Sequence, residues 1–245
     1  MTRFVRLFQD FSAVYVLPQQ RRVSTGAEVP TEIVCLREYI YNLPEQTTWV
    51  AAPSNEDRPG FQTLTDPQYG TAVLAEGVIL TQPNTAAVIQ VADCAVVCLR
   101  HRLTNQLAVF HAGRNALDGS KHQPGHTANN KGMARIALET FLQGDSGELC
   151  EVYVGPHISG VNFDHSHTGA ERHVSWFREQ YGQAAFTNWE RGRLSLRAVL
   201  EAEFNRAGIP TTNVKWDSRC TFSDESLSSY RRNDNHRNTL VVIRK

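Results

Sequence analysis

The stretch that decides the fold is residues 88–113, which reads VIQVADCAVVCLRHRLTNQLAVFHAG. It contains two short apolar runs, VIQVA and QLAVF, each rich in β-forming residues and bounded by turn formers. Each run is therefore predicted to be a strand. The first strand leads toward Cys94 and the second leads into His111. If the two strands are neighbours, they present a thiol and an imidazole close to one another.

Three chemistries suit a thiol beside an imidazole. The pair can belong to a soft metal site, act as a nucleophile with its base, or simply pack in the core. Asp93 favours a functional interpretation, because a carboxylate at the end of an apolar run is costly unless it has a partner. Ala112 and Gly113 follow the imidazole, and such small residues permit close approach of backbone or ligand. The catalytic candidates are therefore Cys94, His111 and Asp93.

Composition and charge narrow the class of protein. The chain has 245 residues, which suits one large domain, and its 25 basic and 25 acidic side chains give a formal net charge of zero. Global attraction to nucleic acid or to a membrane surface is therefore not expected, and a small ligand suits the chain better. The five cysteines form no CxxC pair, which favours a reducing compartment. No stretch resembles a signal peptide or a membrane span, so we expect a cytoplasmic protein, with its oligomeric state open.

The remaining chain alternates between the two kinds of regular structure. Strands or hairpins are predicted at residues 3–17, 47–52, 71–81, 148–155, 212–216 and 239–243. Helices are predicted at residues 30–43, 133–142, 172–191 and 195–207, and a long loop at residues 53–69. This alternation, with adjacent strand pairs, favours a mixed α/β fold.

Two further groups of side chains are candidates for binding. His157 follows Gly155 and Pro156 at the end of a predicted strand, where binding residues often lie. Arginines of the polar segment before the last strand are candidates for holding an anion, since guanidinium groups bind phosphate through paired hydrogen bonds. They are Arg231, Arg232 and Arg237. A glycine-rich phosphate loop, a GxSxG elbow and an HExxH motif are absent from the sequence.

Taken together, these motifs resemble the YfiH family, also called the laccase-domain or polyphenol oxidase family. The resemblance rests on an ordered set: AEGVILT at residues 75–81, Ala92-Asp93-Cys94, His111-Ala112-Gly113, VGPHI at residues 154–158, Cys220-Thr221, and Ser229-Tyr230-Arg231-Arg232 with Arg237 following. It implies a four-layer α/β/β/α fold with mixed β-sheets, in a single domain over residues 1–245.

The resemblance also implies a zinc site built from two histidines and a cysteine. Cys94 and His111 match two of these ligands, and His157 is a further candidate. The segment that carries the first family histidine reads WVAAPS here, at residues 49–54, and contains no histidine. A zinc site with two ligands is weak unless water, Asp93 or a histidine of another loop completes it. Asp93 could instead orient His111.

For function, the resemblance implies an enzyme that acts on purine nucleosides, by phosphorolysis, by deamination or by both. Phosphate would be held by arginines, among them Arg114, which stands one position away from the arginine of the family's Gly-Trp-Arg-Gly segment. Copper-dependent phenol oxidation is a weaker expectation, because a multicopper centre needs many histidines. Two alternatives stay open: a catalytically degenerate member that binds a ligand or a partner, and a metal-free cysteine hydrolase that uses Cys94 and His111.

Overall fold

The computed structural model describes residues 76–80, 85–121, 131–167 and 169–244, and also the backbone of strands at 3–6, 13–20, 35–36, 39–41, 48–51, 63–66 and 70–74. The strands are β1 (Arg3–Arg6), β2 (Ala13–Gln20), β3 (Cys35–Leu36), β4 (Tyr39–Tyr41), β5 (Thr48–Ala51), β6 (Thr63–Asp66), β7 (Gly70–Leu74), β8 (Gly77–Leu80), β9 (Thr85–Val91), β10 (Ala95–His101), β11 (Leu107–Ala112), β12 (Cys150–Val154), β13 (Phe186–Asn188), β14 (Arg193–Leu194), β15 (Val214–Trp216) and β16 (Arg237–Arg244). The α-helices are α1 (Arg114–Leu117), α2 (Met133–Leu142), α3 (Glu171–Tyr181) and α4 (Leu196–Arg206). Short 3-10 helices lie at Gly119–Lys121, Gly147–Leu149, Gly182–Ala185 and Thr211–Asn213.

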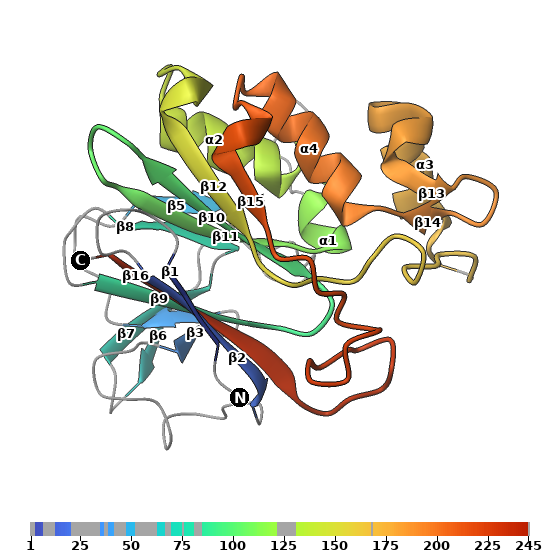
Figure 1. Ribbon diagram of the computed structural model, residues 1–245, viewed down its shortest axis with the longest axis horizontal. Helices are drawn as coiled ribbons and strands as arrows, with labels where there is room; N and C mark the ends of the chain where they lie inside the picture. The colour runs from blue at the N-terminus through green and yellow to red at the C-terminus, as the bar shows by residue number, and fades with distance from the viewer. Residues whose placement is uncertain are drawn as a thin grey trace.

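Two sheets and a layer of helices build the centre of the molecule. A six-stranded sheet has the order β15-β12-β10-β11-β8-β5, and a five-stranded sheet has the order β1-β2-β16-β9-β3. Helices α2 and α4 cover one face of the six-stranded sheet, and the five-stranded sheet lies on the other side (Figure 1). The expected mixed α/β fold is thus confirmed, with helix, sheet and sheet as three successive layers. None of the helices in the described part of the chain is long and apolar enough to cross a membrane.

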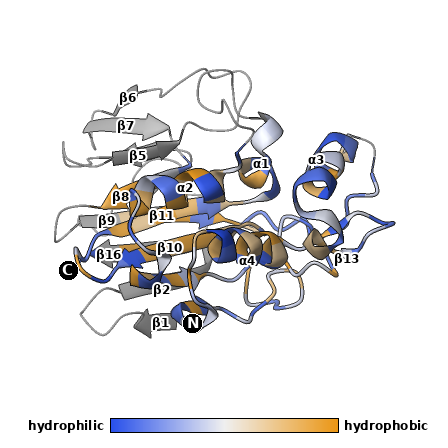
Figure 2. Ribbon diagram, turned by 90° about the horizontal axis from the view of Figure 1, so that it is seen from above, coloured by the Kyte–Doolittle hydropathy of each residue, from blue (hydrophilic) through white to orange (hydrophobic). Residues whose placement is uncertain are grey.

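Strand β10 shows why the six-stranded sheet is buried on both faces. Val97 and Leu99 pack in the core beneath the helices. Val96 and Cys98, which alternate with them, pack in the core between the two sheets. A strand covered on both sides gives an unbroken apolar run instead of an alternating one. Figure 2 shows this concentration of hydrophobic residues in the strands beside α2 and α4.

Several elements confirm the predictions from the sequence. The hairpin of β1 and β2 and the strands β5, β12, β15 and β16 lie where strands were expected. Helices α2 and α4 match their predicted ranges. Ser195 caps α4 by accepting a hydrogen bond from the backbone of Ala198 at 3.1 Å, and Gly208 follows the helix with a φ of 72°.

Other predictions were wrong. The helix expected at residues 30–43 is replaced by β3 and β4, which pair with β9 and β7. The hairpin expected between the strand at residues 71–81 and the strand after the turn at residues 82–84 does not form, because β8 pairs with β5 and β11 in one sheet whereas β9 pairs with β16 and β3 in the other. The helix expected at 172–191 ends at Tyr181 and is followed by β13. In the first two cases, pairing with distant strands overrides local preference, whereas β13 pairs with the nearby β14.

Residues 88–113 contain a strand that was not expected from the sequence. Both predicted runs are strands, in β9 and β11, but they belong to different sheets. Strand β10 forms between them and pairs antiparallel with β11, so that Ala95 faces Ala112. The chain therefore changes sheets at residues 92–94, directly beside the end of β11.

Candidate functional site

Cys94 lies in the bend where the chain passes from β9 in one sheet to β10 in the other. The pairing of Ala95 with Ala112 brings this bend next to Gly113. A Cβ atom on Gly113 would lie 2.4 Å from Cys94 Sγ and 2.8 Å from His111 Nε2. Both distances are far shorter than van der Waals contact, so only glycine lets the thiol and the imidazole occupy this space. The structure thus brings Cys94 and His111 together.

Glu76 extends this pair to a third side chain. Its carboxylate accepts a hydrogen bond from His111 Nδ1 at 2.6 Å. The backbone oxygen of Glu76 also accepts from the backbone N–H of His111 at 2.8 Å. Because Nδ1 is held by the carboxylate, the other ring nitrogen, Nε2, is the one that faces the thiol. Glu76, His111 and Cys94 are therefore three neighbouring side chains, which we call the Cys94 group.

The charge of His111 follows from its neighbours. Burial acts to lower the pKa of His111, but the charges of Glu76 and Cys94 and their hydrogen bonds raise this pKa well above its ordinary value. The side chains of His111 and Glu76 are 28% and 13% exposed, so the ion pair is partly shielded from water. The arrangement is suited to holding a proton on the imidazole beside the cysteine sulfur.

Asp93 has a different role from the one that its position next to Cys94 suggested. Its Oδ1 atom accepts a hydrogen bond from Thr221 Oγ1 at 2.8 Å. Its Oδ2 atom accepts from the backbone N–H of Arg231, also at 2.8 Å. The buried carboxylate thus has the partners it needs, but they hold the C-terminal loop (residues 217–236) against the sheet. The orientation of His111, expected of Asp93, is provided by Glu76.

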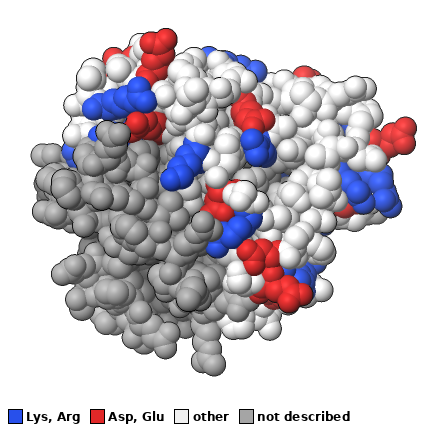
Figure 3. Space-filling view, in the orientation of Figure 1, with Lys and Arg blue, Asp and Glu red and all other residues white. Residues whose placement is uncertain are grey.

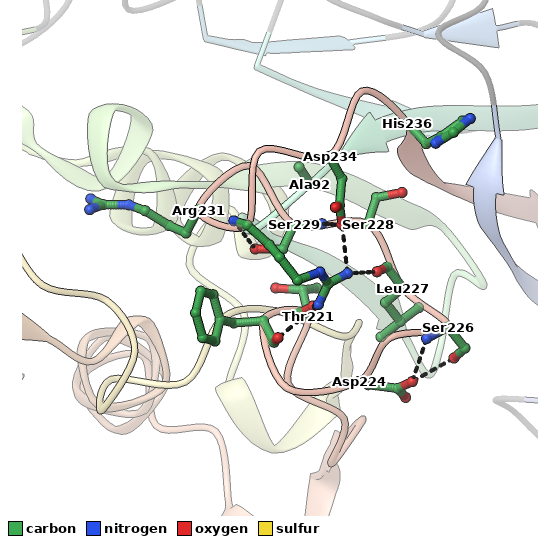
Figure 4. A network of polar contacts seen from close by, with 12 residues as sticks. Ala92, Thr221, Asp224, Ser226, Leu227, Ser228, Ser229, Arg231, Asp234 and His236 are labelled. Carbon is green, nitrogen blue, oxygen red and sulfur yellow. Dashed lines mark hydrogen bonds and ion pairs between the residues drawn. The ribbon is translucent and has the colours of Figure 1, made fainter.

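The guanidinium group of Arg232 forms hydrogen bonds within the C-terminal loop. Its Nη1 atom donates to the carbonyl oxygens of Thr221 at 2.9 Å and Phe222 at 2.7 Å. Its Nη2 atom donates to the carbonyl of Leu227 and to the carboxylate of Asp234 (Figure 4). With its donors engaged in this way, Arg232 stabilises the loop and is not the anion-binding group that was expected.

Arg231 extends in another direction, away from this network (Figure 4). Its guanidinium carbon lies 5.2 Å from the centre of the Phe163 ring, and Nη1 donates to the carbonyl of Asp164 at 2.9 Å. Arg237, at the start of β16, donates instead to the neighbouring carbonyl of His236 at 2.8 Å. Of the three C-terminal arginines predicted to bind an anion, Arg231 and Arg237 therefore each use one side-chain donor, and Arg231 is the one whose charge acts on Arg114.

Arg114 and Arg231 influence one another and a nearby histidine. Burial and the positive charge of Arg231 lower the pKa of Arg114, although Cys94 and Asp118 act in the opposite direction. Burial together with the charges of Arg114 and Arg231 lowers the pKa of His165 to about 3. Neither guanidinium forms an ion pair with any carboxylate in the described ranges. Two arginines without an ion-pair partner in the described ranges therefore act on one another, and Arg114 also interacts with Cys94 and Asp118.

This positive charge is local. Basic and acidic side chains are interspersed over the described part of the face in Figure 3. Attraction of an anion to this protein therefore depends on the pair Arg114 and Arg231 and not on a large charged surface.

His157 does not join Cys94 and His111 as a metal ligand. Its Nδ1 atom donates to the carbonyl of Gly155 at 2.9 Å, and its ring packs 6.0 Å from that of Trp216. Across the described residues, no group of three or more His, Cys, Asp or Glu side chains is arranged to hold a metal ion. Catalytic zinc takes three protein ligands, so the donor set described by the structure does not fit this ion. The six residues 49–54, where the family's first histidine was expected, supply no imidazole.

The sequence offered one signal that would have found Glu76. Like Asp93, it is a carboxylate next to an apolar run, since β8 continues directly as Val78, Ile79 and Leu80. What the sequence does not show is that β8 pairs with β11, with Gly77 facing Phe110. This register places Glu76 beside His111, 35 positions further along the chain.

Comparison with known proteins shows that this chain matches one protein family. Residues 47–243 match the family described as "Multi-copper polyphenol oxidoreductase laccase". A Corynebacterium glutamicum protein named purine nucleoside phosphorylase is 29% identical over 167 residues, which are 68% of this chain and 61% of that protein. A Mycobacterium tuberculosis protein of the same name is 25% identical over 158 residues, 64% of this chain and 56% of the relative. The chain thus spans about three fifths of the length of these curated relatives.

Solved structures share the fold. The Bacillus licheniformis hypothetical protein YfiH matches with a TM-score of 0.58 and 21% identity, over 70% of this chain and 62% of its own. YlmD from Geobacillus stearothermophilus matches with a TM-score of 0.57 and 17% identity, over 69% of this chain and 61% of its own.

Proposed function

Because the chain belongs to the multi-copper polyphenol oxidoreductase laccase family, and because relatives similar to it are named purine nucleoside phosphorylases, we propose that it cleaves purine nucleosides with phosphate. In this reaction a phosphate oxygen bonds to C1′ of the ribose, the bond from C1′ to the purine nitrogen breaks, and the purine leaves with a proton. The site must therefore hold an anion and handle a proton next to it.

The observation that carries the proposal is the pair Arg114 and Arg231. Within the described ranges neither guanidinium forms an ion pair with a carboxylate; the charge of Arg231 acts on Arg114, both charges act on His165, and Arg114 also interacts with Cys94. Phosphate bound between two arginines is held by charge-assisted hydrogen bonds, which are about twice as strong as neutral ones. Burial, together with their positive charge, lowers the pKa of His165 and keeps it neutral, so this imidazole does not add a proton to the binding region at neutral pH.

His111 is our candidate for the proton donor. Glu76 holds its Nδ1 atom and stabilises the protonated ring, and the side chain remains partly exposed. A general acid in this position protonates the purine as the glycosidic bond breaks. Cys94 lies beside Gly113 together with His111 and interacts with this imidazole.

No step of this proposal passes through a metal ion. Cys94 and His111 offer two donor atoms, and the described residues add no third. Deamination of adenosine is the finer alternative at the same site. It needs an activated water in place of phosphate, so release of ammonia instead of free base would favour it.

The decisive experiment measures free base and ribose 1-phosphate from inosine, guanosine and adenosine, with and without inorganic phosphate, in protein whose metal content has been determined. We expect release of base that depends on phosphate. Arg231→Ala should raise the KM for phosphate by about tenfold or more, because one charged hydrogen-bonding partner of the anion is lost.

Arg237→Ala is the matched control. It removes an arginine of the same part of the chain whose donor bonds only the adjacent carbonyl, and its KM for phosphate should stay within about twofold of the starting protein. A folded protein that binds nucleosides but releases no base with any of them would contradict the proposal and favour the degenerate, ligand-binding alternative.

A further inference from the structure

A cavity of about 270 Å³ lies between helices α2 and α4, which are neighbours on the helical face of the six-stranded sheet (Figures 1 and 2). The loop that borders it contacts the last residue of β10, because Asp145 accepts a hydrogen bond from His101 at 3.1 Å. Cys94 precedes the first residue of the same strand. The seven residues of β10, at about 3.3 Å each, separate the two places by roughly 20 Å. The cavity is therefore separate from the Cys94 group.

Part of the cavity wall is apolar. Leu138 and Leu142 of α2 line it, and both belong to the buried core beneath the helices. Gly144 lies at the rim, where an added Cβ atom would meet no described atom within 4 Å, so this side is open. A ligand that enters there can place an apolar group on the two leucines.

A buried carboxylate forms another part of the wall. Glu203 of α4 accepts hydrogen bonds from Arg135 Nε at 3.0 Å and from Arg135 Nη2 at 2.9 Å. The hydroxyl of Tyr181 donates to it at 2.8 Å, and Arg206 Nη1 is a further donor. A buried charge is stable only when it is paired in this way. Glu203 therefore fixes the positions of two guanidinium groups at the cavity.

These two arginines carry more positive charge than Glu203 neutralises. One carboxylate balances one guanidinium, so one positive charge remains. Within the described chain, Nη1 of Arg135 and both Nε and Nη2 of Arg206 have no hydrogen-bond partner. Both residues line the cavity, and their side chains are 19% and 47% exposed, so the remaining donors are available to a ligand.

The other carboxylates that line the cavity are already paired. Glu139 accepts hydrogen bonds from Lys131 Nζ at 2.8 Å and 2.6 Å, and Asp145 accepts from His101. Both carboxylate side chains are more than half exposed, so water and salt screen their charge. The less exposed guanidinium of Arg135 therefore determines the sign of the charge that a ligand meets beside the leucines.

We propose that this cavity binds a small monocarboxylic acid with an apolar body. Its carboxylate accepts hydrogen bonds from Arg135 and Arg206, and its apolar body packs on Leu138 and Leu142. The volume equals about nine water molecules at about 30 Å³ each, which suits a ligand of roughly ten non-hydrogen atoms. This site goes beyond nucleoside phosphorolysis, since it requires neither a purine nor phosphate.

The test uses 3-phenylpropanoate, its neutral isostere 3-phenylpropanamide, the cation 3-phenylpropan-1-amine and inorganic phosphate, each titrated into the full chain by calorimetry at pH 7. We expect the acid to bind at least about tenfold more tightly than the amide, because only the acid forms charged hydrogen bonds with the arginines. It should exceed phosphate by a similar factor, because phosphate has no apolar group. Equal affinity of acid and amide, tighter binding of the amine or of phosphate, or no binding of the acid at millimolar concentration would each overturn the proposal.

Three variants locate the binding. Arg206→Gln should weaken the acid about fivefold or more and leave the amide unchanged, and Glu203 keeps Arg135 and Tyr181 as partners. Arg197→Gln, the matched control, removes an exposed arginine of α4 that pairs with Glu201 and does not line the cavity, so affinity should stay within about twofold.

Ala207→Phe places a large side chain in the cavity and should abolish binding of both acid and amide. Unchanged binding in Ala207→Phe, or equal losses in Arg206→Gln and Arg197→Gln, would show that the acid binds elsewhere and would refute the site. Circular dichroism confirms that each variant is folded. These outcomes are independent of phosphorolysis, because no nucleoside is present.

Discussion

The protein contains two neighbourhoods in which a cysteine meets a histidine at the end of a strand, and only one has the geometry of a reactive pair. In the first, His111 lies between Glu76 and Cys94. In the second, His157 and Cys220 pair as an isolated parallel β-bridge. There the imidazole donates to the carbonyl of Gly155, two residues away in the chain.

The sulfur of Cys220 accepts hydrogen bonds from groups other than His157. The backbone N–H of Ser159 lies 3.2 Å from it and the side-chain nitrogen of Asn162 lies 3.6 Å from it. Burial acts to raise the pKa of Cys220, but hydrogen bonds with the side chain and backbone of Ser159, the backbone of Ser223 and the side chain of Asn162 prevail and lower this pKa to about 7. The comparison shows that the thiol and the imidazole lie together in this protein where a carboxylate holds the far ring nitrogen and a glycine leaves room for both.

The largest difference between the two neighbourhoods should appear in catalysis. Cys94→Ala removes the sulfur that shapes the His111 environment, and we expect phosphate-dependent release of base to fall by about 100-fold or more. Cys220→Ala should stay within about threefold. Base release is measured by chromatography on proteins with matching circular dichroism spectra. Equal losses of base release in both variants would contradict a special role for the cysteine beside His111.

The second-largest effect is expected for substitution of Gly113, which should lower both stability and base release. Gly113→Ala places a methyl group where Cys94 Sγ and His111 Nε2 lie, so the pair must separate, and crowding should cost about 1–3 kcal/mol of unfolding free energy in urea. Gly160→Ala is the matched control, because its Cβ would meet Thr187 at 2.6 Å, away from the Cys94 group. Both variants should lose stability, and only Gly113→Ala should also lose base release.

The two histidines should affect stability with opposite pH dependence. Burial is the main cause that lowers the pKa of His157, so its stabilising contribution is present above the unfolded value of about 6.5 and is lost as pH falls. The pKa of His111 is raised, so its contribution is present below about 6.5 and is lost as pH rises toward the folded value.

Urea unfolding between pH 5 and 8 measures this difference. Compared with the starting protein, His157→Asn should lose less stability on acidification, and His111→Asn should lose less on alkalinisation. Each change is at most about 1.4 kcal/mol per pH unit. Parallel pH profiles for the two variants would contradict the opposite charge states of these rings.

The smallest expected effect concerns chemical labelling. At pH 7, iodoacetamide should modify Cys94 and Cys220, which are partly exposed, at least about tenfold faster than the buried Cys98 and Cys150. Burial raises the pKa of Cys150 to about 12 and that of Cys98 further still, so both stay protonated. Peptide mass spectrometry reads the sites, and rapid labelling of Cys98 would show that the core between the sheets opens.

Much of the local structure could be predicted from the sequence because its causes are local. The apolar spacing of α2 and the Ser195 cap of α4 lie within a few residues of the elements they define. Residues 30–43 carry helical spacing too, but β3 and β4 form there because β9 and β7 offer backbone partners. Local spacing contains no information about such partners, which explains the error.

For the candidate site, the sequence by itself determined which groups stand at strand ends: the thiol of Cys94, the imidazole of His111 and the arginines that follow. Tertiary structure alone decided their use. Pairing of β8 with β11 gave His111 the carboxylate of Glu76, and the loop turned Arg231 outward while Arg232 became its internal support. The physical reason is that an apolar run specifies a strand, whereas the neighbour of each side chain is set by the register of strands that are distant in the chain.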